Sequence, residues 1–175
     1  MSDVTRTAVT RLDTVTDAQL AELAVLLIDC VHDGAEVSFM HPLSMERALS
    51  FWRGVAADSE SGGRALLVAE HEGKIIGTVQ VILAQPDNQP HRGDVAKTLV
   101  HPGARRQGLG ASLMRAAEDT ARQAGKTLLV LDTASGDAER VNRRLGWKFA
   151  GTIPGYALKP HGGLSSTSFF YRDLT

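Results

Sequence analysis

The glycine-bearing loop at residues 103–110 limits the possible folds of this chain more than any other stretch. The loop reads Gly-Ala-Arg-Arg-Gln-Gly-Leu-Gly. A strand-like run, residues 94–100, precedes it, and a long amphipathic segment follows. Where such a loop joins the end of a strand to the start of a helix, unpaired backbone N–H groups gather at the positive end of the helix dipole. The stretch therefore predicts a strand-loop-helix unit with a site for a phosphate-bearing ligand.

Hydrophobic periodicity predicts a mixed α/β fold around this unit. Apolar residues at helical spacing predict helices within residues 18–33, 44–60, 109–124 and 136–145. Alternating or short continuous apolar runs predict strands at residues 7–12, 64–70, 75–83, 94–100, 128–131, 148–152 and 167–174. The order β-α-α-β-β-β-α-β-α-β-β favours antiparallel hairpins first and a β-α-β crossover near the end. Pro154, Gly155 and Tyr156 are expected to lie in a loop.

Length, charge and composition exclude several classes of protein. The chain has 175 residues, and we expect residues 1–175 to form one domain with a substantial core. Its net charge of −1 lacks the basic surplus of a nucleic-acid-binding protein. The polar start and the absence of a long apolar run argue against a signal peptide and a membrane span. The single cysteine, Cys30, lies in a helical apolar pattern and is interpreted as the buried thiol of a cytoplasmic protein.

Three phosphate-binding patterns compete for the glycine loop. A P-loop has Lys and then Ser or Thr after its second glycine, but Leu109 and Gly110 stand there, so this pattern fails. A dinucleotide fingerprint needs a third glycine where Leu113 stands, and it belongs after the first strand of its fold. Although Asp132 follows at about 20 residues, where a ribose-binding acid belongs, several strands precede the loop, so this pattern is disfavoured.

The third pattern is Arg105-x-x-Gly108-x-Gly110 between a strand and an amphipathic helix. It resembles the acetyl-CoA pyrophosphate loop of the GNAT superfamily of N-acetyltransferases. Residues 142–147, Asn-Arg-Arg-Leu-Gly-Trp, resemble the corner where the last helix of that family gives way to a strand. Further similarity to the tabtoxin-resistance type of GNAT enzyme, which acetylates a β-lactam-containing amino acid toxin, is found at residues 31–40, 131–133 and 154–156. The resemblance implies a mostly antiparallel sheet of about seven strands. The sheet would be splayed at the acyl-CoA site, with helices on both faces.

The resemblance also implies that acetyl-CoA is the acyl donor and indicates which residues hold it. Gly108 and Gly110 would let backbone N–H groups approach the pyrophosphate without a Cβ in the way. Leu99 and Val100 would pair their backbone with the pantetheine arm as a neighbouring strand does. The expected cofactor-binding residues are Leu99, Val100, Arg105, Arg106, Gln107, Gly108, Leu109, Gly110, Ala111 and Asn142.

The implied reaction, attack of an amine on a thioester, requires a base. An alkyl ammonium titrates at ~10, so a proton must leave before the nitrogen attacks at neutral pH. Asp94 opens the central strand and Asp132 ends the strand beyond the helix, and we expect both carboxylates to face one pocket as catalytic groups. The alternative for Asp94 is a solvated strand-start residue, and for Asp132 a cap of the next helix.

Asn142 marks a departure from the GNAT pattern. Family members often have a Tyr four residues before the corner glycine, where its hydroxyl protonates the departing thiolate, but this chain has Asn142 there. An amide hydrogen-bonds a sulfur but gives up no proton at neutral pH. Since a positioned acid contributes ~10²–10⁴-fold, a slower enzyme is expected. Tyr156 is either a substitute catalytic acid or a packing or substrate-contact residue.

The remaining expectations concern the acceptor and other partners. The resemblance implies direct transfer to a primary amine of a small amino acid-like or antibiotic-like molecule, with substrate contacts at His32, Phe39, Met40 and Tyr156. The six histidines show no metal-ligand spacing, so no metal is expected. An acyl-CoA-binding sensor or regulatory module without chemistry is the alternative function, because Asn142 replaces the expected acid. A homodimer is left open.

Overall fold

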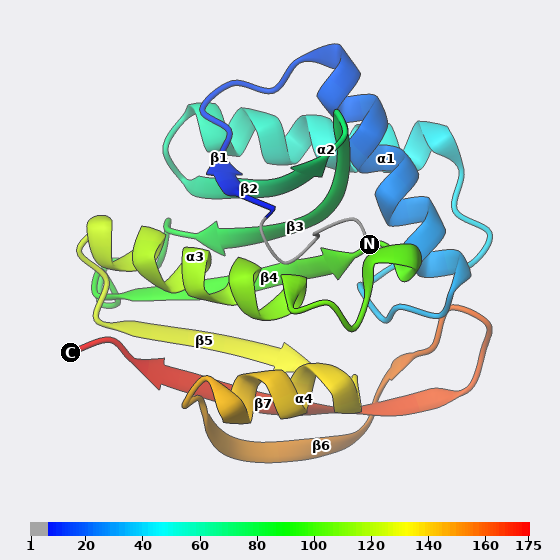
Figure 1. The fold of residues 1–175 in the computed structure, drawn as a ribbon. Helices are drawn as coiled ribbons and strands as arrows, with labels where there is room; N and C mark the ends of the chain where they lie inside the picture. The colour runs from blue at the N-terminus through cyan, green and yellow to red at the C-terminus, as the bar shows by residue number, and fades with distance from the viewer. Residues whose placement is uncertain (1–6) are drawn as a thin grey trace.

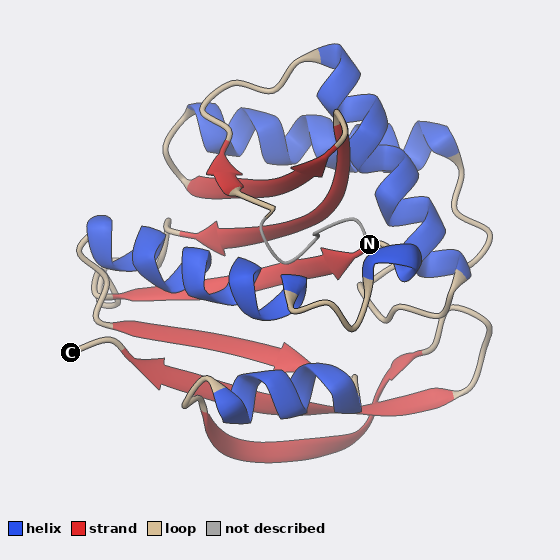
Figure 2. Ribbon diagram, in the orientation of Figure 1, coloured by secondary structure: helices blue, strands red, loops and turns tan. Residues whose placement is uncertain are grey.

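Residues 7–175, which the computed structural model describes, form a seven-stranded sheet with helices on both faces (Figure 1, Figure 2). The strands are β1 (Val9–Arg11), β2 (Arg64–His71), β3 (Lys74–Ile82), β4 (Arg92–Val100), β5 (Leu128–Thr133), β6 (Lys148–Leu158) and β7 (Leu164–Asp173). The helices are α1 (Asp17–His32), α2 (Met45–Glu60), α3 (Leu109–Gln123) and α4 (Gly136–Arg144), with a 3₁₀ turn, η2 (Pro102–Ala104), before α3. This element order and the mixed α/β class confirm the prediction from periodicity.

Two apolar clusters hold the helices against opposite faces of the sheet. On one face α3 buries Leu113 and Ala117 against the strands, and α4 lies beside it over β7 (Figure 1). On the other face α1 and α2 pack through Leu27 and Trp52, both fully buried. Among the described residues, this second cluster contains no member of β5, β6 or β7. The α1/α2 layer therefore ends near β4 and leaves the face of the last three strands accessible.

Polar side chains at the helix starts explain why the helices begin where they do. Thr16 and Gln19 form a reciprocal capping box at α1, with hydrogen bonds of 3.1 and 2.9 Å. Ser44 caps α2 by accepting a hydrogen bond from the backbone N–H of Arg47 at 3.2 Å. Ser135 caps α4 in the same way. These caps replace hydrogen bonds that the first turn of a helix cannot make within itself.

The parallel pair β4 and β5 opens the middle of the sheet. The sheet order is β1-β2-β3-β4-β5-β7-β6, and only β4 and β5 are parallel among the described strands. Their pairing covers only residues 92–94 of β4 and 128–130 of β5. Beyond Asp94, β4 continues to Val100 without a β5 partner, while β5 remains paired with β7 to Thr133. The two halves of the sheet thus diverge, as expected for the splayed sheet.

The predicted loop at Pro154, Gly155 and Tyr156 is wrong, because these residues belong to β6. The register between β6 and β7 shifts between Ile153 and Ala157, so the three residues form a bulge within the strand. Proline has no N–H for the ladder, and Gly155 adopts a φ of 60°. A bulge accommodates both residues without ending the strand. The prediction failed because proline and glycine are typical of both loops and bulges.

Candidate active site

The start of α3 presents free backbone donors at one end of the splay. Gly108 is the N-cap with a φ of 81°, and no side chain among residues 7–175 caps the helix. A Cβ placed on Gly108 or on Gly110 would meet no atom of the described chain within 4 Å. Space for a ligand therefore lies directly before the first N–H groups of the helix. This arrangement suits an anion such as a diphosphate.

The polar residues of the same loop have different roles. Arg105 braces the loop: its guanidinium pairs with Asp33, the C-cap residue of α1, at 2.5 Å and donates to the carbonyl of Val100 at 3.2 Å. Arg106 is exposed and has a φ of 62°, whereas Gln107 is partly buried. Arg105, one of the expected cofactor-binding residues, has its charge balanced by Asp33. Arg106 is the more open cation, although the sequence pattern favoured Arg105.

The predicted pantetheine-binding residues lie at the end of β4. Leu99 is buried in the α1/α2 cluster and pairs with Thr78 of β3, and Val100 pairs with Gly77. On the β5 side, neither Leu99 nor Val100 has a strand partner among the described residues. Their backbone thus faces the opening between the two halves of the sheet. Leu109 and Ala111, in the first turn of α3, are buried and partly buried, respectively.

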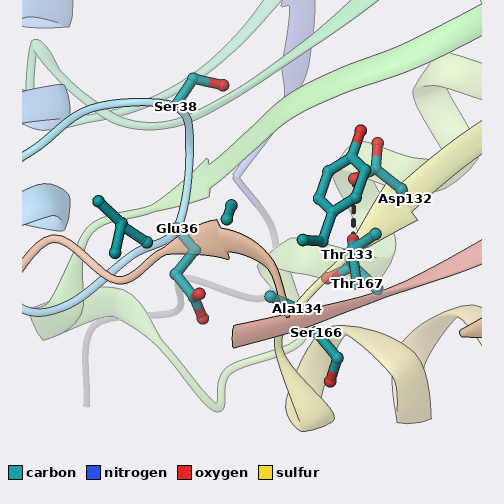
Figure 3. A pocket seen from close by; sticks show the side chains of 10 residues that line it. Glu36, Ser38, Asp132, Thr133, Ala134, Ser166 and Thr167 are labelled. Carbon is teal, nitrogen blue, oxygen red and sulfur yellow. Dashed lines mark hydrogen bonds between the residues drawn. The ribbon is translucent and has the colours of Figure 1, made fainter. Parts of the chain in front are cut away.

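A pocket of about 120 Å³ lies at the end of β5, on the sheet face opposite α3 (Figure 3). Residues from four parts of the chain line it: the loop between α1 and α2, the end of β5, the bulge of β6, and β7. The lining residues are Glu36, Ser38, Asp132, Thr133, Ala134, Tyr156, Ala157, Leu158, Ser166 and Thr167. Figure 3 shows Glu36 and Asp132 on different walls of this pocket. Its size suits a small molecule or the end of a longer one.

Asp132 is the predicted catalytic residue that lines this pocket. Its neighbours Leu129 and Leu131 are buried toward α3, so the alternation of a strand directs Asp132 to the opposite face. Thr167 of β7 donates a hydrogen bond to Oδ2 of Asp132 at 2.8 Å (Figure 3). This bond holds the carboxylate against the pocket wall. The alternative role as a helix cap belongs instead to Ser135.

The structure does not bring Asp94 into the same pocket. Asp94 pairs with Val130, two residues before Asp132 along β5. The carboxylate of Asp94 accepts a hydrogen bond from Nε2 of Gln85 at 3.0 Å and forms an ion pair with Arg92. Asp94 is not among the residues that line the pocket. The expected meeting of the two carboxylates is therefore not observed, and a direct role for Asp94 has no geometric support.

Lys97 reaches this site, although its sequence position gave no sign of it. The register between β3 and β4 shifts here, and Lys97 has a φ of 52°, which marks a bulge. Its Nζ donates to Oγ of Ser38 on the pocket wall at 3.2 Å. Burial lowers the pKa of Lys97; the nearby Asp132 carboxylate opposes this shift and Arg64 adds to it. Simple alternation along β4 does not reveal the bulge, so periodicity missed this residue.

Asn142 and Tyr156 occupy different environments. Asn142 is 4% exposed in α4, and its backbone carbonyl accepts the N–H of Trp147 at 3.0 Å. Tyr156 is 52% exposed, lines the pocket, and has its ring edge-on to Phe169 at 6.2 Å. The β6 bulge is what brings Tyr156 to the pocket.

The predicted substrate residues His32, at the end of α1, and Phe39 and Met40, in the loop that follows, are not among the residues that line the pocket. Phe39 packs edge-on against Phe51, with 5.2 Å between ring centroids, and Met40 is 42% exposed. His32 is grouped with His41 and His161, whose ring centroids lie 4.9 and 6.3 Å from its own. The same loop does line the pocket, but through Glu36 and Ser38.

The three histidines join the α1–α2 loop to the hairpin between β6 and β7. Nε2 of His161 lies 2.8 Å from the carbonyl oxygen of His32, and the N–H of His41 donates to the carbonyl of Pro160 at 3.0 Å. Burial lowers the pKa of His41, as do the neighbouring His161 and His32. Within residues 7–175, no group of three or more His, Cys, Asp or Glu is arranged to hold a metal ion. None of the described helices is long and apolar enough to cross a membrane.

Comparison with known proteins decides the family. The model of the acetyltransferase (GNAT) family matches residues 29–147. An uncharacterized N-acetyltransferase in the hisH-hisA intergenic region of Azospirillum brasilense is 33% identical over 134 residues, covering 75% of this chain and 76% of that relative. The chain belongs to the GNAT acetyltransferase family. The predicted family is confirmed, whereas the narrower likeness to the tabtoxin-resistance type stays a prediction.

Solved GNAT structures share the fold over nearly the full chain. The structure of yncA from Salmonella typhimurium with its cofactor acetyl-CoA has a TM-score of 0.80, with 20% identity over 97% of this chain and 95% of that one. A phosphinothricin acetyltransferase from Sinorhizobium meliloti, in complex with acetyl-CoA, has a TM-score of 0.78 and 19% identity, covering 95% of this chain and 88% of its own. The expected GNAT fold is confirmed.

Proposed function

We propose that this GNAT protein transfers an acetyl group from acetyl-CoA to a primary amine of a small amino acid-like or antibiotic-like molecule. One observation carries the proposal: the splay between β4 and β5 lies between an uncapped helix start on one face of the sheet and the Asp132 pocket on the other face. The first feature suits a phosphate-bearing acyl carrier, and the second suits an amine that must lose a proton. Two relatives of the same fold were solved with acetyl-CoA, which supports the choice of donor.

The residues at the start of α3 fit acetyl-CoA. Gly108 and Gly110 leave the helix N–H groups open to a pyrophosphate, and Arg106 is an exposed cation beside them. The edge of β4 at Leu99 and Val100 has no β5 partner and offers backbone groups to an amide-containing arm, although the Val100 carbonyl already accepts a hydrogen bond from Arg105. When bound, acetyl-CoA supplies a thioester whose carbonyl carbon accepts the amine.

Asp132 is the base in this proposal. Its carboxylate lines the pocket and is oriented by Thr167, so it is placed to take a proton from an ammonium group, directly or through water. Asp94 shares the sheet face but is held by Arg92 and Gln85, which leaves it an indirect role at most. Buried Asn142 is suited to hydrogen-bond a sulfur atom. Tyr156, whose side chain lines the pocket, is the candidate to protonate the leaving thiolate in place of the Tyr that Asn142 replaces.

A second candidate function is an acyl-CoA-binding sensor without catalysis. Asn142 favours it, because an amide in place of the usual hydroxyl supplies no proton to a leaving thiolate. The pocket with Asp132 favours the enzyme, because a sensor has no need of a base beside a small-molecule pocket.

Release of free thiol from acetyl-CoA in the presence of a panel of amines tests the proposal. The panel contains amino acids, simple alkyl amines and amine-bearing antibiotics, and CoA binding is measured in parallel by calorimetry. We expect amine-dependent thiol release. Tight CoA binding without thiol release from any amine would overturn the enzyme and leave the sensor.

A further inference from the structure

Glu36 is a pocket carboxylate without a cationic partner among residues 7–175. Its side chain lines the pocket from the α1–α2 loop (Figure 3). Its Oε1 is buried and accepts no hydrogen bond, and Glu36 forms no ion pair with residues 7–175. A buried, unpaired carboxylate oxygen is costly, because it has lost its water and gained no donor. A ligand that brings a donor to Glu36 removes that cost.

The charges around the pocket indicate what kind of donor this is. Two carboxylates, Glu36 and Asp132, line the pocket, whereas no Lys or Arg is among its lining residues. Lys97 reaches the wall through Ser38 and is electrostatically coupled to Asp132. Lys97 thus offsets the charge of Asp132, whereas no ion pair within residues 7–175 offsets the charge of Glu36. A positively charged group complements this wall better than a neutral or anionic one.

Two carboxylates on different walls also suit two nitrogens of one small molecule. Asp132, the base in the proposed function, lies at the end of β5, so the nitrogen to be acetylated belongs there. Glu36 lies on the α1–α2 loop at another wall of the pocket (Figure 3). A second nitrogen at that wall takes no part in the chemistry and contributes only to binding.

We propose that the acceptor carries a second cationic nitrogen, besides the amine that is acetylated, and that Glu36 selects it. Small diamines and basic amino acids belong to this class. The inference rests on the proposed function and deepens it, because it assigns the charge of the acceptor. Glu36 is here a specificity-determining residue: it binds the distal nitrogen and leaves the rate of the chemical step to Asp132.

Two pairs of acceptors test the proposal, since each pair differs only in the distal nitrogen. The pairs are 1,4-diaminobutane with butylamine, and L-ornithine with L-norvaline. In the unaltered protein we expect the member of each pair that has the distal nitrogen to show about 10- to 100-fold higher kcat/KM, because the other member lacks the hydrogen bond to the Glu36 carboxylate. The difference should appear in KM. In Glu36→Gln the preference should collapse to a few-fold while kcat changes little.

Glu46→Gln is the matched control, because Glu46 is exposed in the first turn of α2 and lies outside the pocket. It should keep the preference. Thermal unfolding checks that Glu36→Gln folds; loss of an unpaired carboxylate should leave its Tm equal or raise it. Equal kcat/KM within both pairs, or a preference that survives Glu36→Gln, would overturn the inference while leaving acetyl transfer intact.

A separate readout covers the case in which no amine is acetylated. Calorimetry with CoA present then compares binding of 1,4-diaminobutane and butylamine to the unaltered protein and to Glu36→Gln. If no amine is acetylated, the proposed function is refuted, but the assignment of Glu36 is not. A diamine preference that Glu36→Gln removes would still support the assignment of Glu36, and equal binding of both amines would refute it.

Discussion

Replacement of Asp132 by Asn tests the role of this carboxylate as a base without changing the shape of the pocket. Asparagine has the same shape as aspartate, and its carbonyl oxygen can still accept the hydrogen bond that Thr167 donates at 2.8 Å. Asp132 is exposed at the pocket, so the change leaves no new buried donor without a partner. The variant should therefore fold normally and lose only the capacity to take a proton.

The size of the loss follows from the role of the carboxylate. A positioned base typically contributes ~10²–10⁴-fold, which corresponds to ~3–5 kcal/mol in the activation free energy. We expect kcat for Asp132→Asn to fall by that factor. The affinity for CoA should stay the same, because the α3 start proposed to receive the pyrophosphate lies on the opposite face of the sheet from the Asp132 carboxylate.

The assay is thiol release under saturating acetyl-CoA, with CoA affinity measured by calorimetry for each variant. Asp94→Asn is the comparison variant: its carboxylate is held by Arg92 and Gln85 outside the pocket, so kcat should fall much less. A loss in Asp132→Asn below about threefold would refute the assignment of the base, since a general base contributes far more than that. An equal loss in CoA affinity would show that Asp132 acts in binding or folding instead.

Three further predictions concern the cofactor loop, the core and the buried thiol. Gly108→Val should weaken CoA binding about tenfold in calorimetry, because a β-branched residue disfavours the φ of 81° by ~1–2 kcal/mol; unchanged affinity would contradict the role of this turn. Glu118→Leu should lower the Tm by ~6–12 °C in thermal unfolding, because Glu118 accepts from Nε1 of buried Trp147 at 2.9 Å and lies 3.6 Å from Arg172; an unchanged Tm would contradict it. Burial raises the pKa of the Cys30 thiol from 9.0 to about 11, so its contribution to stability is present below pH 9 and is lost as pH rises toward 11. The free energy of unfolding should fall over that range more steeply than in Cys30→Ala, and parallel pH profiles would contradict the burial effect.

The fold was largely predictable from local signals. The capping hydroxyls of Thr16 and Ser44, and the helical spacing after them, predicted the starts of α1 and α2 to within a residue or two. The loop at Gly108 predicted the site at the start of α3, because a positive φ and an uncapped helix are properties of a few adjacent residues. The β6 strand was cut short in the prediction, since a bulge at Pro154 looks like a turn in sequence.

The candidate site was less predictable, because it depends on which strands lie next to each other and where they part. Asp94 and Asp132 were expected to meet, since they come from adjoining strands. Their relative height along the sheet, and the ion pair between Asp94 and Arg92, became apparent only from the register and the side-chain contacts. Glu36 and Lys97 were missed, because a loop residue and a bulge residue carry no periodicity that directs them to a pocket.

By itself the sequence determined the order of the elements, the helix start that suits a phosphate, and the acid at the end of β5. These features depend on residues close together in the chain, where backbone sterics, capping and alternation act directly. Only the tertiary structure decided which carboxylates share a pocket and which lack a partner. Those facts arise from the β4/β5 splay, the β4 and β6 bulges and the docking of the α1–α2 loop, which bring together residues as distant in sequence as Glu36 and Thr167.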